Sequence, residues 1–179
     1  VASSEEVSDL SDAVAASQED LDELLANSSV FSGDVNINST ATLAAFKSIG
    51  SGLAIVNGNV IITTNADMVH ADVQAVVDQI LTVTKDFTYT SHASTYAETT
   101  FNNLSGVQTL TLKQGGGYKA QGLVSATNIV LNDTWESNVT IVDLRGLTTV
   151  TNLSNEGVAN GVLKFNKATE MHLTSLAKF

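Results

Sequence analysis

The chain has 179 residues, of which 43% are hydrophobic and 15% are charged. This length and apolar share are enough to bury a core, which excludes wholesale disorder. Eight basic residues stand against 19 acidic ones, giving a formal net charge of −11. A surface of this charge repels phosphates, so we expect neither nucleic acid nor an anionic membrane surface as the partner.

Cysteine is absent, which excludes disulfides, thiolate metal sites and thiol nucleophiles. No apolar run approaches the roughly 18 residues that a membrane span requires, so we expect no direct membrane insertion. Serine, threonine and asparagine are abundant, whereas charged residues are scarce. This composition is common in secreted adhesive and structural proteins, and a cysteine-free chain is ordinary for an exported bacterial protein. We therefore expect an extracellular location at the bacterial cell surface.

Residues 1–29 are expected to form an acidic amphipathic helix. Ser3 and Glu6 fit a capping box at its start. The segment carries eight acidic residues and no basic one, so a parallel homodimer of this helix alone repels itself. Two roles stay open: a cap, in which residues 3–26 cover the end of the following unit, and a coiled-coil stalk. The apolar residues follow one another at heptad spacing, with one slot missing: Val7, Leu10, Val14, Leu21 and Leu24.

Residues 30–179 form a second unit with a repeat. Residues 33–41 recur 25 positions later as residues 58–66, with glycine, valine, isoleucine and alanine in the same places. Each copy holds two apolar residues at strand spacing, Val35 with Ile37 and Val60 with Ile62. We expect later pairs at irregular steps to be strands as well, some of them on opposite sides of one coil. These pairs are Phe87 and Tyr89, Leu110 and Leu112, Ile129 and Leu131, Val139 and Ile141, Leu163 and Phe165, and Met171 and Leu173.

Two helical segments are expected between the first strands. Leu43 and Phe46 indicate a short helical turn. A longer helix is indicated by an apolar stripe with Asp67 as its N-cap; the stripe consists of Val69, Val73, Val76 and Ile80.

A unit of strand, turn, helix or loop, and strand, about 25 residues long, is typical of leucine-rich repeats, whose stacked units share one continuous core. The expected fold is therefore mainly β with helices: a leucine-rich-repeat-like, parallel β-solenoid preceded by an acidic N-terminal α-helix. The phrase around Leu173 is typical of a coil inside an array, so we expect these 179 residues to be part of a longer chain.

Residues 44–49 and 53–56, followed by Gly58-Asn59-Val60-Ile61-Ile62, form a hydrophobic run that leads into a strand. This run resembles the receptor L-domain and bacterial cell-surface leucine-rich-repeat families. Residues 146–153 and 168–176 are similar to further coils of those families, whereas residues 67–103 match poorly. The cysteines of animal receptor L-domains are missing, which favours the bacterial branch. The resemblance implies an elongated binding or spacer module, and no active-site residues carry over.

The sequence offers little catalytic chemistry. His70, His92 and His172 belong to no ligand-spaced motif, and the glycine-rich residues 114–118 lack the ending of a phosphate loop. Arg145, the only arginine, lies two positions from Asp143, which is the nearest approach to the basic and acidic groups of a polysaccharide lyase. We expect no enzyme activity, no catalytic, cofactor-binding or metal-binding residue, and no cofactor.

Two minor binding hypotheses remain open. Oxygen ligands for calcium are available in turn positions: Asp34, Asn36, Asn57, Asn59 and Asn65. Thr-x-Thr pairs place two hydroxyls on one strand face, and aligned rows of threonine can match an ice lattice. These pairs are Thr82 and Thr84, Thr88 and Thr90, Thr109 and Thr111, and Thr149 and Thr151.

The composition, the repeat and the sparse chemistry together predict a non-catalytic extracellular repeat module of a bacterial surface protein. We expect it to act in adhesion or as a structural or filament segment. Its expected partners are a protein or glycan at the cell surface, or neighbouring copies of itself. The alternatives are a carbohydrate-active enzyme or calcium-dependent glycan binder on a parallel β-helix, and ice binding as a minor third.

Overall fold

The computed structural model describes residues 28–49, 52–92, 98–113, 117–132, 140–156, 161–164 and 170–176. Residues 1–27 of the expected helix, and the expected strand residues Val139 and Phe165, lie outside the described residues. The expected helix boundary at residue 29 is wrong, because Ser28 and Ser29 pair with a neighbouring strand as the start of a strand. Within the described residues the protein is mainly β with two helices, and every strand pair is parallel.

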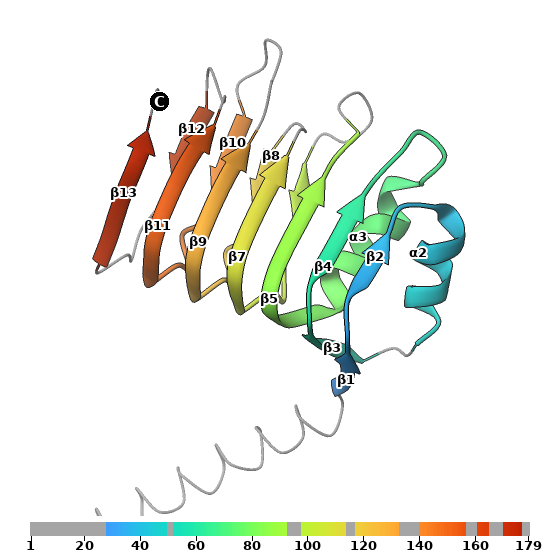
Figure 1. The fold of residues 1–179 in the computed structure, drawn as a ribbon. Helices are drawn as coiled ribbons and strands as arrows, with labels where there is room; N and C mark the ends of the chain where they lie inside the picture. Colours follow the sequence, from blue (N-terminus) through green and yellow to red (C-terminus); the bar gives the residue numbers. More distant parts are fainter. Residues whose placement is uncertain are drawn as a thin grey trace, which may run out of the picture.

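Nine strands form one long sheet (Figure 1). Its main path runs through β1 (Ser28–Ser32), β3 (Leu53–Asn57), β5 (Ile80–Thr90), β7 (Gly106–Lys113), β9 (Ser125–Asn132), β11 (Thr149–Glu156) and β13 (Glu170–Leu176). Two short strands, β2 (Val35–Ile37) and β4 (Val60–Thr63), join it through the second half of β5.

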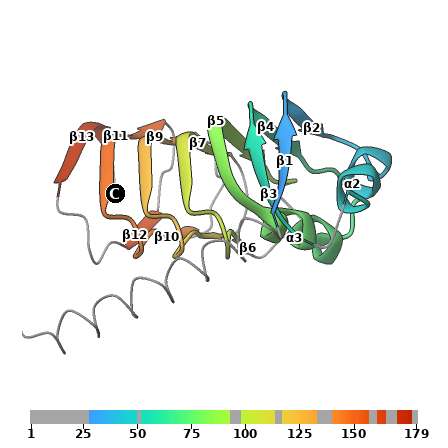
Figure 2. The same ribbon diagram turned by 90° about the horizontal axis from the view of Figure 1, so that it is seen from below.

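A second wall faces the long sheet across the core (Figure 2). It begins with α2 (Thr40–Lys47) and α3 (His70–Gln79) and continues as a small sheet. The strands of the small sheet are β6 (Thr99–Thr100), β8 (Gly117–Lys119), β10 (Thr140–Asp143) and β12 (Gly161–Lys164), paired in that order. Two parallel walls that enclose one core are compatible with a solenoid-like fold.

The chain returns to the long sheet after each coil, by which we mean the stretch between register partners in neighbouring strands. The first register partners of successive strands along the main path lie 25, 26, 24, 19, 24 and 21 residues apart, and register shifts change some of these spacings by one residue further along the strands. The expected 25-residue repeat is confirmed, because Val35 pairs with Val60 and Ile37 with Ile62. Irregular steps between the apolar pairs were also expected, with some pairs on the opposite side of a coil. Ile141 and Leu163 are such cases, because they lie in β10 and β12 of the small sheet.

Inward side chains form columns that run through successive strands. One column holds Val35, Val60, Phe87, Leu110, Ile129 and Leu153, and the next holds Ile37, Ile62, Tyr89, Leu112 and Leu131. All of these except Val35 are almost completely buried, and Val35 packs against them at the N-terminal end. The expectation that these apolar pairs share one core is confirmed for the strands whose burial is described.

Aromatic rings fill the centre of this core. Phe101 lies edge-to-face against Phe87 and Tyr89, with ring centroids 5.5 and 5.7 Å apart. Tyr118 makes the same kind of contact with Tyr89, at 5.8 Å. The Tyr89 hydroxyl is satisfied in the interior, because the Thr99 hydroxyl donates to it at 3.0 Å.

The helix α2 is longer than the expected helical turn because a capping box extends it. The Ser39 hydroxyl accepts from the Thr42 amide, and the Thr42 hydroxyl accepts from the Ser39 amide. Leu43 and Phe46 are buried, as expected for the inward face of a helix.

The expected N-cap of α3 is wrong. Val69 occupies the N-cap position, in extended conformation and with no side-chain cap, and Asp67 lies two residues before it. The Asn65 side chain accepts from the Asp67 amide, and its carbonyl accepts from the Met68 amide at 3.2 Å. Asp67 is thus part of an asparagine-closed turn, and the helix begins only after that turn is complete.

Truncating Ile62 to alanine should lower the free energy of unfolding by about 2–5 kcal/mol, because the side chain is fully buried. Chemical denaturation of the two proteins measures the difference. Ile61→Ala is the matched control, since this neighbour on the same strand is 41% exposed. A loss below about 0.5 kcal/mol for Ile62→Ala, or equal losses for both variants, would contradict the register.

Candidate functional site

The candidate site is the outward face of the long sheet, which is the side turned away from the helices and the small sheet. A first row on this face holds Gln108, Thr127 and Thr151, all exposed. A second row, which we call the bend column, holds Asp34, Asn59, Asp86, Thr109, Asn128 and Asn152 at one register position.

Side chains of the bend column are hydrogen-bonded from one coil to the next. The Asp34 carboxylate accepts from the backbone amide of Asn59 at 2.8 Å and from its side-chain amide at 3.0 Å. The Asn59 side chain in turn accepts from the backbone amide of Asp86 at 3.2 Å. Later coils repeat the ladder, since Asn128 donates to the Thr109 hydroxyl and Asn152 donates to Asn128.

The bend column exists because the strands bend at this position. In β7 the buried residues Val107 and Leu110 are three positions apart, so two consecutive residues, Gln108 and Thr109, lie between them outside the core. A regular strand alternates at every residue. A short polar side chain suits this position because it can bond the backbone amides that a bend leaves unpaired.

In the first two coils the bend is a full corner made by glycines. Gly33 has φ of +116°, in a region that side chains rarely adopt. A Cβ on Gly58 would lie 2.2 Å from the Gly33 carbonyl oxygen. The two corners can therefore stack only if the second position is glycine.

Threonine does not form continuous rows on the outward face. Thr88 pairs with Thr111, but Thr111 pairs next with Val130, and Thr109 pairs with Asp86. The Thr-x-Thr pairs of β5 and β7 are therefore out of register with each other. An ice lattice needs regular rows, which this arrangement of the described strands does not provide.

The candidate calcium ligands take part in hydrogen bonds of the bend column and the neighbouring turns. Asn57 accepts from the Thr84 hydroxyl at 3.1 Å, and Asn65 both accepts from Asp67 and donates to the Asn38 carbonyl. Asn36 lies on the outward face of β2, where it is exposed. Among the residues that the structure describes, no three His, Asp or Glu side chains gather closely enough to hold a metal ion.

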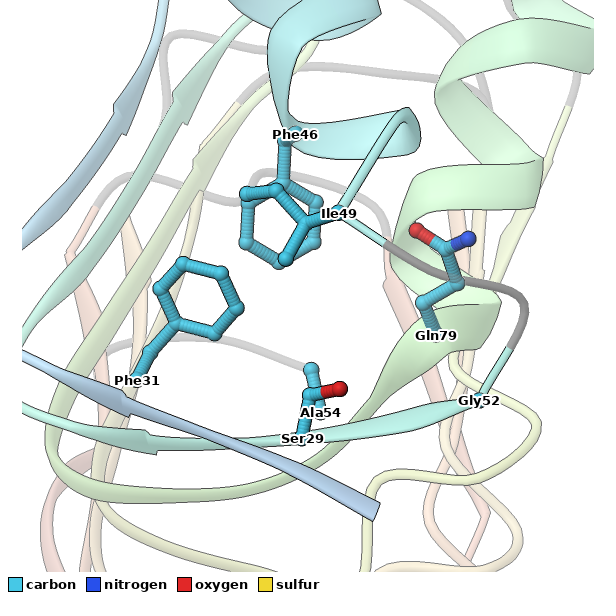
Figure 3. Close-up of a pocket in the computed structure, with 7 residues that line it drawn as sticks. All are labelled: Ser29, Phe31, Phe46, Ile49, Gly52, Ala54 and Gln79. Atoms are coloured by element: carbon cyan, nitrogen blue, oxygen red, sulfur yellow. The ribbon is translucent and has the colours of Figure 1, made fainter. Parts of the chain in front are cut away.

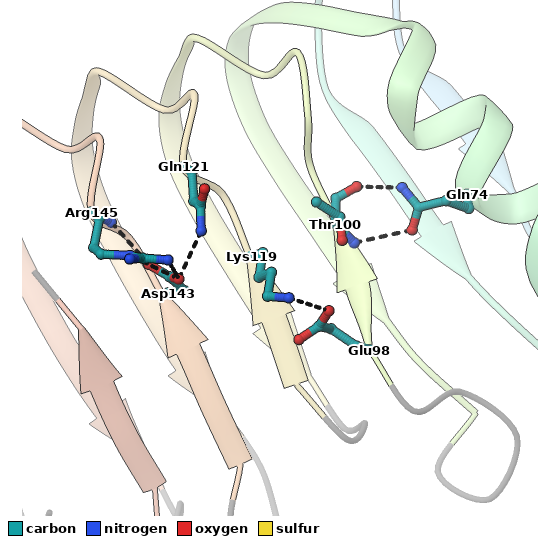
Figure 4. A network of polar contacts seen from close by, with 7 residues as sticks. All are labelled: Gln74, Glu98, Thr100, Lys119, Gln121, Asp143 and Arg145. Atoms are coloured by element: carbon teal, nitrogen blue, oxygen red, sulfur yellow. Dashed lines mark hydrogen bonds and ion pairs between the residues drawn. The ribbon is translucent and has the colours of Figure 1, made fainter.

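Asp143 and Arg145, the candidate lyase pair, lie at the end of β10 on the opposite wall (Figure 4). The guanidinium donates to both Asp143 oxygens, at 2.6–3.0 Å, and Gln121 donates to the same carboxylate at 2.9 Å. The Asp143 side chain is 2% exposed, whereas that of Arg145 is 44% exposed. This geometry fixes the corner of one coil to the preceding coil.

The Asp143 carboxyl has an altered pKa. The hydrogen bond from Arg145 is the largest cause and lowers the pKa from 3.8 to about 2, although burial acts in the opposite direction. Gln121 and the Arg145 backbone amide also favour the ionised form.

The histidines belong to separate elements: His70 begins α3, His92 follows β5 and His172 lies in β13. The end of the glycine-rich segment forms β8, in which Tyr118 is buried and donates to the Lys113 carbonyl at 2.9 Å. None of the described helices is long and apolar enough to cross a membrane.

The bend column and a clearer form of the repeat were not predicted from the sequence. Three segments share buried residues at spacings of three, three, three and two. They are Phe101, Leu104, Val107, Leu110 and Leu112; Ala120, Leu123, Ala126, Ile129 and Leu131; and, without the last position, Leu144, Leu147, Val150 and Leu153. Aligning these segments would have revealed the bend column, because Thr109, Asn128 and Asn152 each precede the fourth position.

Comparison with protein-family models, with curated proteins and with solved structures gave no match. The functional conclusion therefore depends on the geometry of the chain itself.

Gly146→Ala should destabilise the protein by about 1–3 kcal/mol or more, because the added Cβ would lie 1.8 Å from the Gln121 carbonyl oxygen. Gly106→Ala is the control, since its Cβ would meet no atom closer than 3.8 Å. This control should be neutral or slightly stabilising. Thermal and denaturant unfolding of both variants measure the difference, and equal stabilities would contradict the close stacking of the corners.

Asp143→Asn should remove about 2 kcal/mol of stability at neutral pH, the value that corresponds to lowering the pKa from 3.8 to about 2. A carboxyl whose folded-state pKa is lowered stabilises above its unfolded pKa. Its contribution is lost as pH falls from about 4 towards 2. The difference between the native protein and the variant should therefore shrink over that interval.

Denaturant unfolding at a series of pH values from 2 to 7 measures this difference. Asp67→Asn, in which the carboxyl is exposed, controls for the loss of one negative charge. A difference that does not change with pH would show that ionisation of Asp143 contributes nothing to stability.

Proposed function

We propose that this protein is a non-catalytic, extracellular repeat module of a bacterial surface protein, built as a leucine-rich-repeat-like solenoid. It acts in adhesion or as a structural segment of a filament. The observation that carries the proposal is the outward face of the long sheet, where polar side chains recur at fixed positions in successive coils.

The chemistry of the outward face favours an uncharged, hydroxyl-rich partner. Gln108, Thr127 and Thr151 offer amide and hydroxyl groups that both donate and accept hydrogen bonds. Neighbouring strands lie about 4.8 Å apart, so the same groups recur along the sheet at that interval. A glycan chain is a partner of this chemistry.

The remaining features support a module without catalysis. The single arginine of the chain is paired with Asp143. In the bend column, Asn59 lies between the two carboxylates, Asp34 and Asp86, so they do not form a pair of adjacent acids. A low share of charged residues and the absence of cysteine fit an exported bacterial chain.

Screening the intact protein on a glycan array should identify bound glycans. For any bound glycan, the double variant Thr127→Lys and Thr151→Lys should weaken binding at least tenfold, because two long cations then stand on adjacent strands of the outward face. Ala71→Lys is the control, since Ala71 is exposed on α3 in the opposite wall. Isothermal calorimetry with the bound glycan gives the affinities.

Two results would overturn the proposal. Equal binding by the double variant would place the ligand elsewhere on the molecule. Turnover of a polysaccharide, measured with and without calcium and abolished by Arg145→Ala, would show that the protein is an enzyme. Absence of binding to every glycan on the array would exclude a glycan as the partner and leave a protein surface or a neighbouring copy.

A further inference from the structure

The first coil leaves apolar side chains uncovered at the N-terminal end of the molecule. Phe31 and Val35 are partly buried, whereas Val56 and Val60, their partners in the next coil, are fully buried. In the described part of the chain, β1 and β2 pair on one side only, with β3 and β4. In the described residues, the first coil therefore has no preceding coil to cover its apolar side chains, whereas each later coil does.

The helix α2 follows directly after β2 and also carries exposed apolar residues. Ala41 and Ala45 are exposed and lie four residues apart, so they share one face of the helix. That face differs from the one towards α3, because Lys47 reaches Asp72 of α3 at 2.7 Å. Ile49, just after the helix, is 46% exposed.

Phe31 and Ile49 line a shallow hollow together with Ser29, Phe46, Gly52, Ala54 and Gln79 (Figure 3). The Phe31 and Phe46 rings lie at 5.5 Å, and Ile49 points towards the same hollow. Ser29, at the start of β1, lies on its opposite side. We call Phe31, Val35, Ala41, Ala45 and Ile49 the N-terminal end surface; none of its five side chains is charged.

We propose that the apolar seam of residues 3–26 packs on the N-terminal end surface. The segment ends at Asn27, directly before the first residue of β1, and β1 borders the hollow. Leu24 and Leu21 are four and seven residues from Ser28, so the tether is short. A short tether makes docking within one chain far more favourable than docking between chains.

Length and charge both fit this occupant. A helix formed by residues 3–26 would be about 36 Å long, several times the roughly 10 Å between two packed sheets. Its acidic side chains can stay in water while the seam faces the uncharged end surface. Pairing of this segment with its counterpart in a second copy would instead bring together eight acidic residues from each chain, with no basic residue to offset them.

Disulfide trapping in the full chain tests the proposal, and the absence of native cysteine makes every disulfide diagnostic. Ile49→Cys is combined in turn with Leu10→Cys, Leu21→Cys and Leu24→Cys. Air oxidation of dilute protein should give an intrachain disulfide in at least one of the three, detected by non-reducing electrophoresis and peptide mass. Glu23→Cys with Ile49→Cys is the control, because Glu23 lies on the far side of the helix from Leu21.

The expected result is a yield for the best seam position at least five times that of the Glu23 control. Interchain disulfides in place of intrachain ones would show that a second copy covers the surface. No disulfide in any seam variant would show that the segment stands away as a stalk. Equal yields from seam and control positions would show an undirected tether. Each of these three results overturns the proposal.

Discussion

Hydrogen bonding between parallel strands of successive coils requires each residue of the long sheet to lie over its counterpart in the next coil. Strand pairing continues along the main path, with register shifts in the β3–β5, β5–β7 and β11–β13 pairs, although register partners lie between 19 and 27 residues apart. The variation is absorbed on the other wall, which changes from helix to strand, and in the connections. The long sheet is therefore the fixed element, and the positions of the core, the corners and the outward face all follow from it.

Stacking also constrains which polar residues can be used. Register partners lie about 4.8 Å apart, and like charges at that distance destabilise a sheet. The bend column respects this constraint, since Asn59 separates Asp34 from Asp86 and the later coils use neutral Thr109, Asn128 and Asn152. Stacking of the coils therefore favours neutral over charged residues in this column.

Much of the long sheet could be predicted from the sequence because the first two coils are close copies. The match of residues 33–41 with residues 58–66 predicts the pairing of Val35 with Val60. Assignment of later strands to one sheet or the other could not be predicted, since an apolar pair such as Leu163 with its neighbours looks the same on either wall. The start of α3 was placed wrongly because Asp67 suits a turn as well as an N-cap.

The site was harder to predict than the fold. Asp143 and Arg145 are two positions apart, so their proximity was evident, but the third partner, Gln121, comes from the preceding coil. The bend column has no local motif, because its members are single Asp, Asn or Thr residues about one coil apart. They become visible only when each coil is aligned on its buried residues, and the long step through residues 67–103 obscures that alignment.

That same step explains how one core can have a helical wall and a stranded wall. Gln74 of α3 lies beside the edge strand β6, accepts from the Thr100 amide at 3.0 Å and donates to the Thr100 carbonyl (Figure 4). The side-chain amide thereby takes the place of a strand peptide and satisfies the open edge. The change from helix to strand is thus accommodated on this wall. In the long sheet, β5 still pairs with β7, with a register shift between Val83 and Asp86. Within the described residues the outward face consequently continues from the helical coils to the stranded coils, and a continuous surface of this kind suits an extended partner.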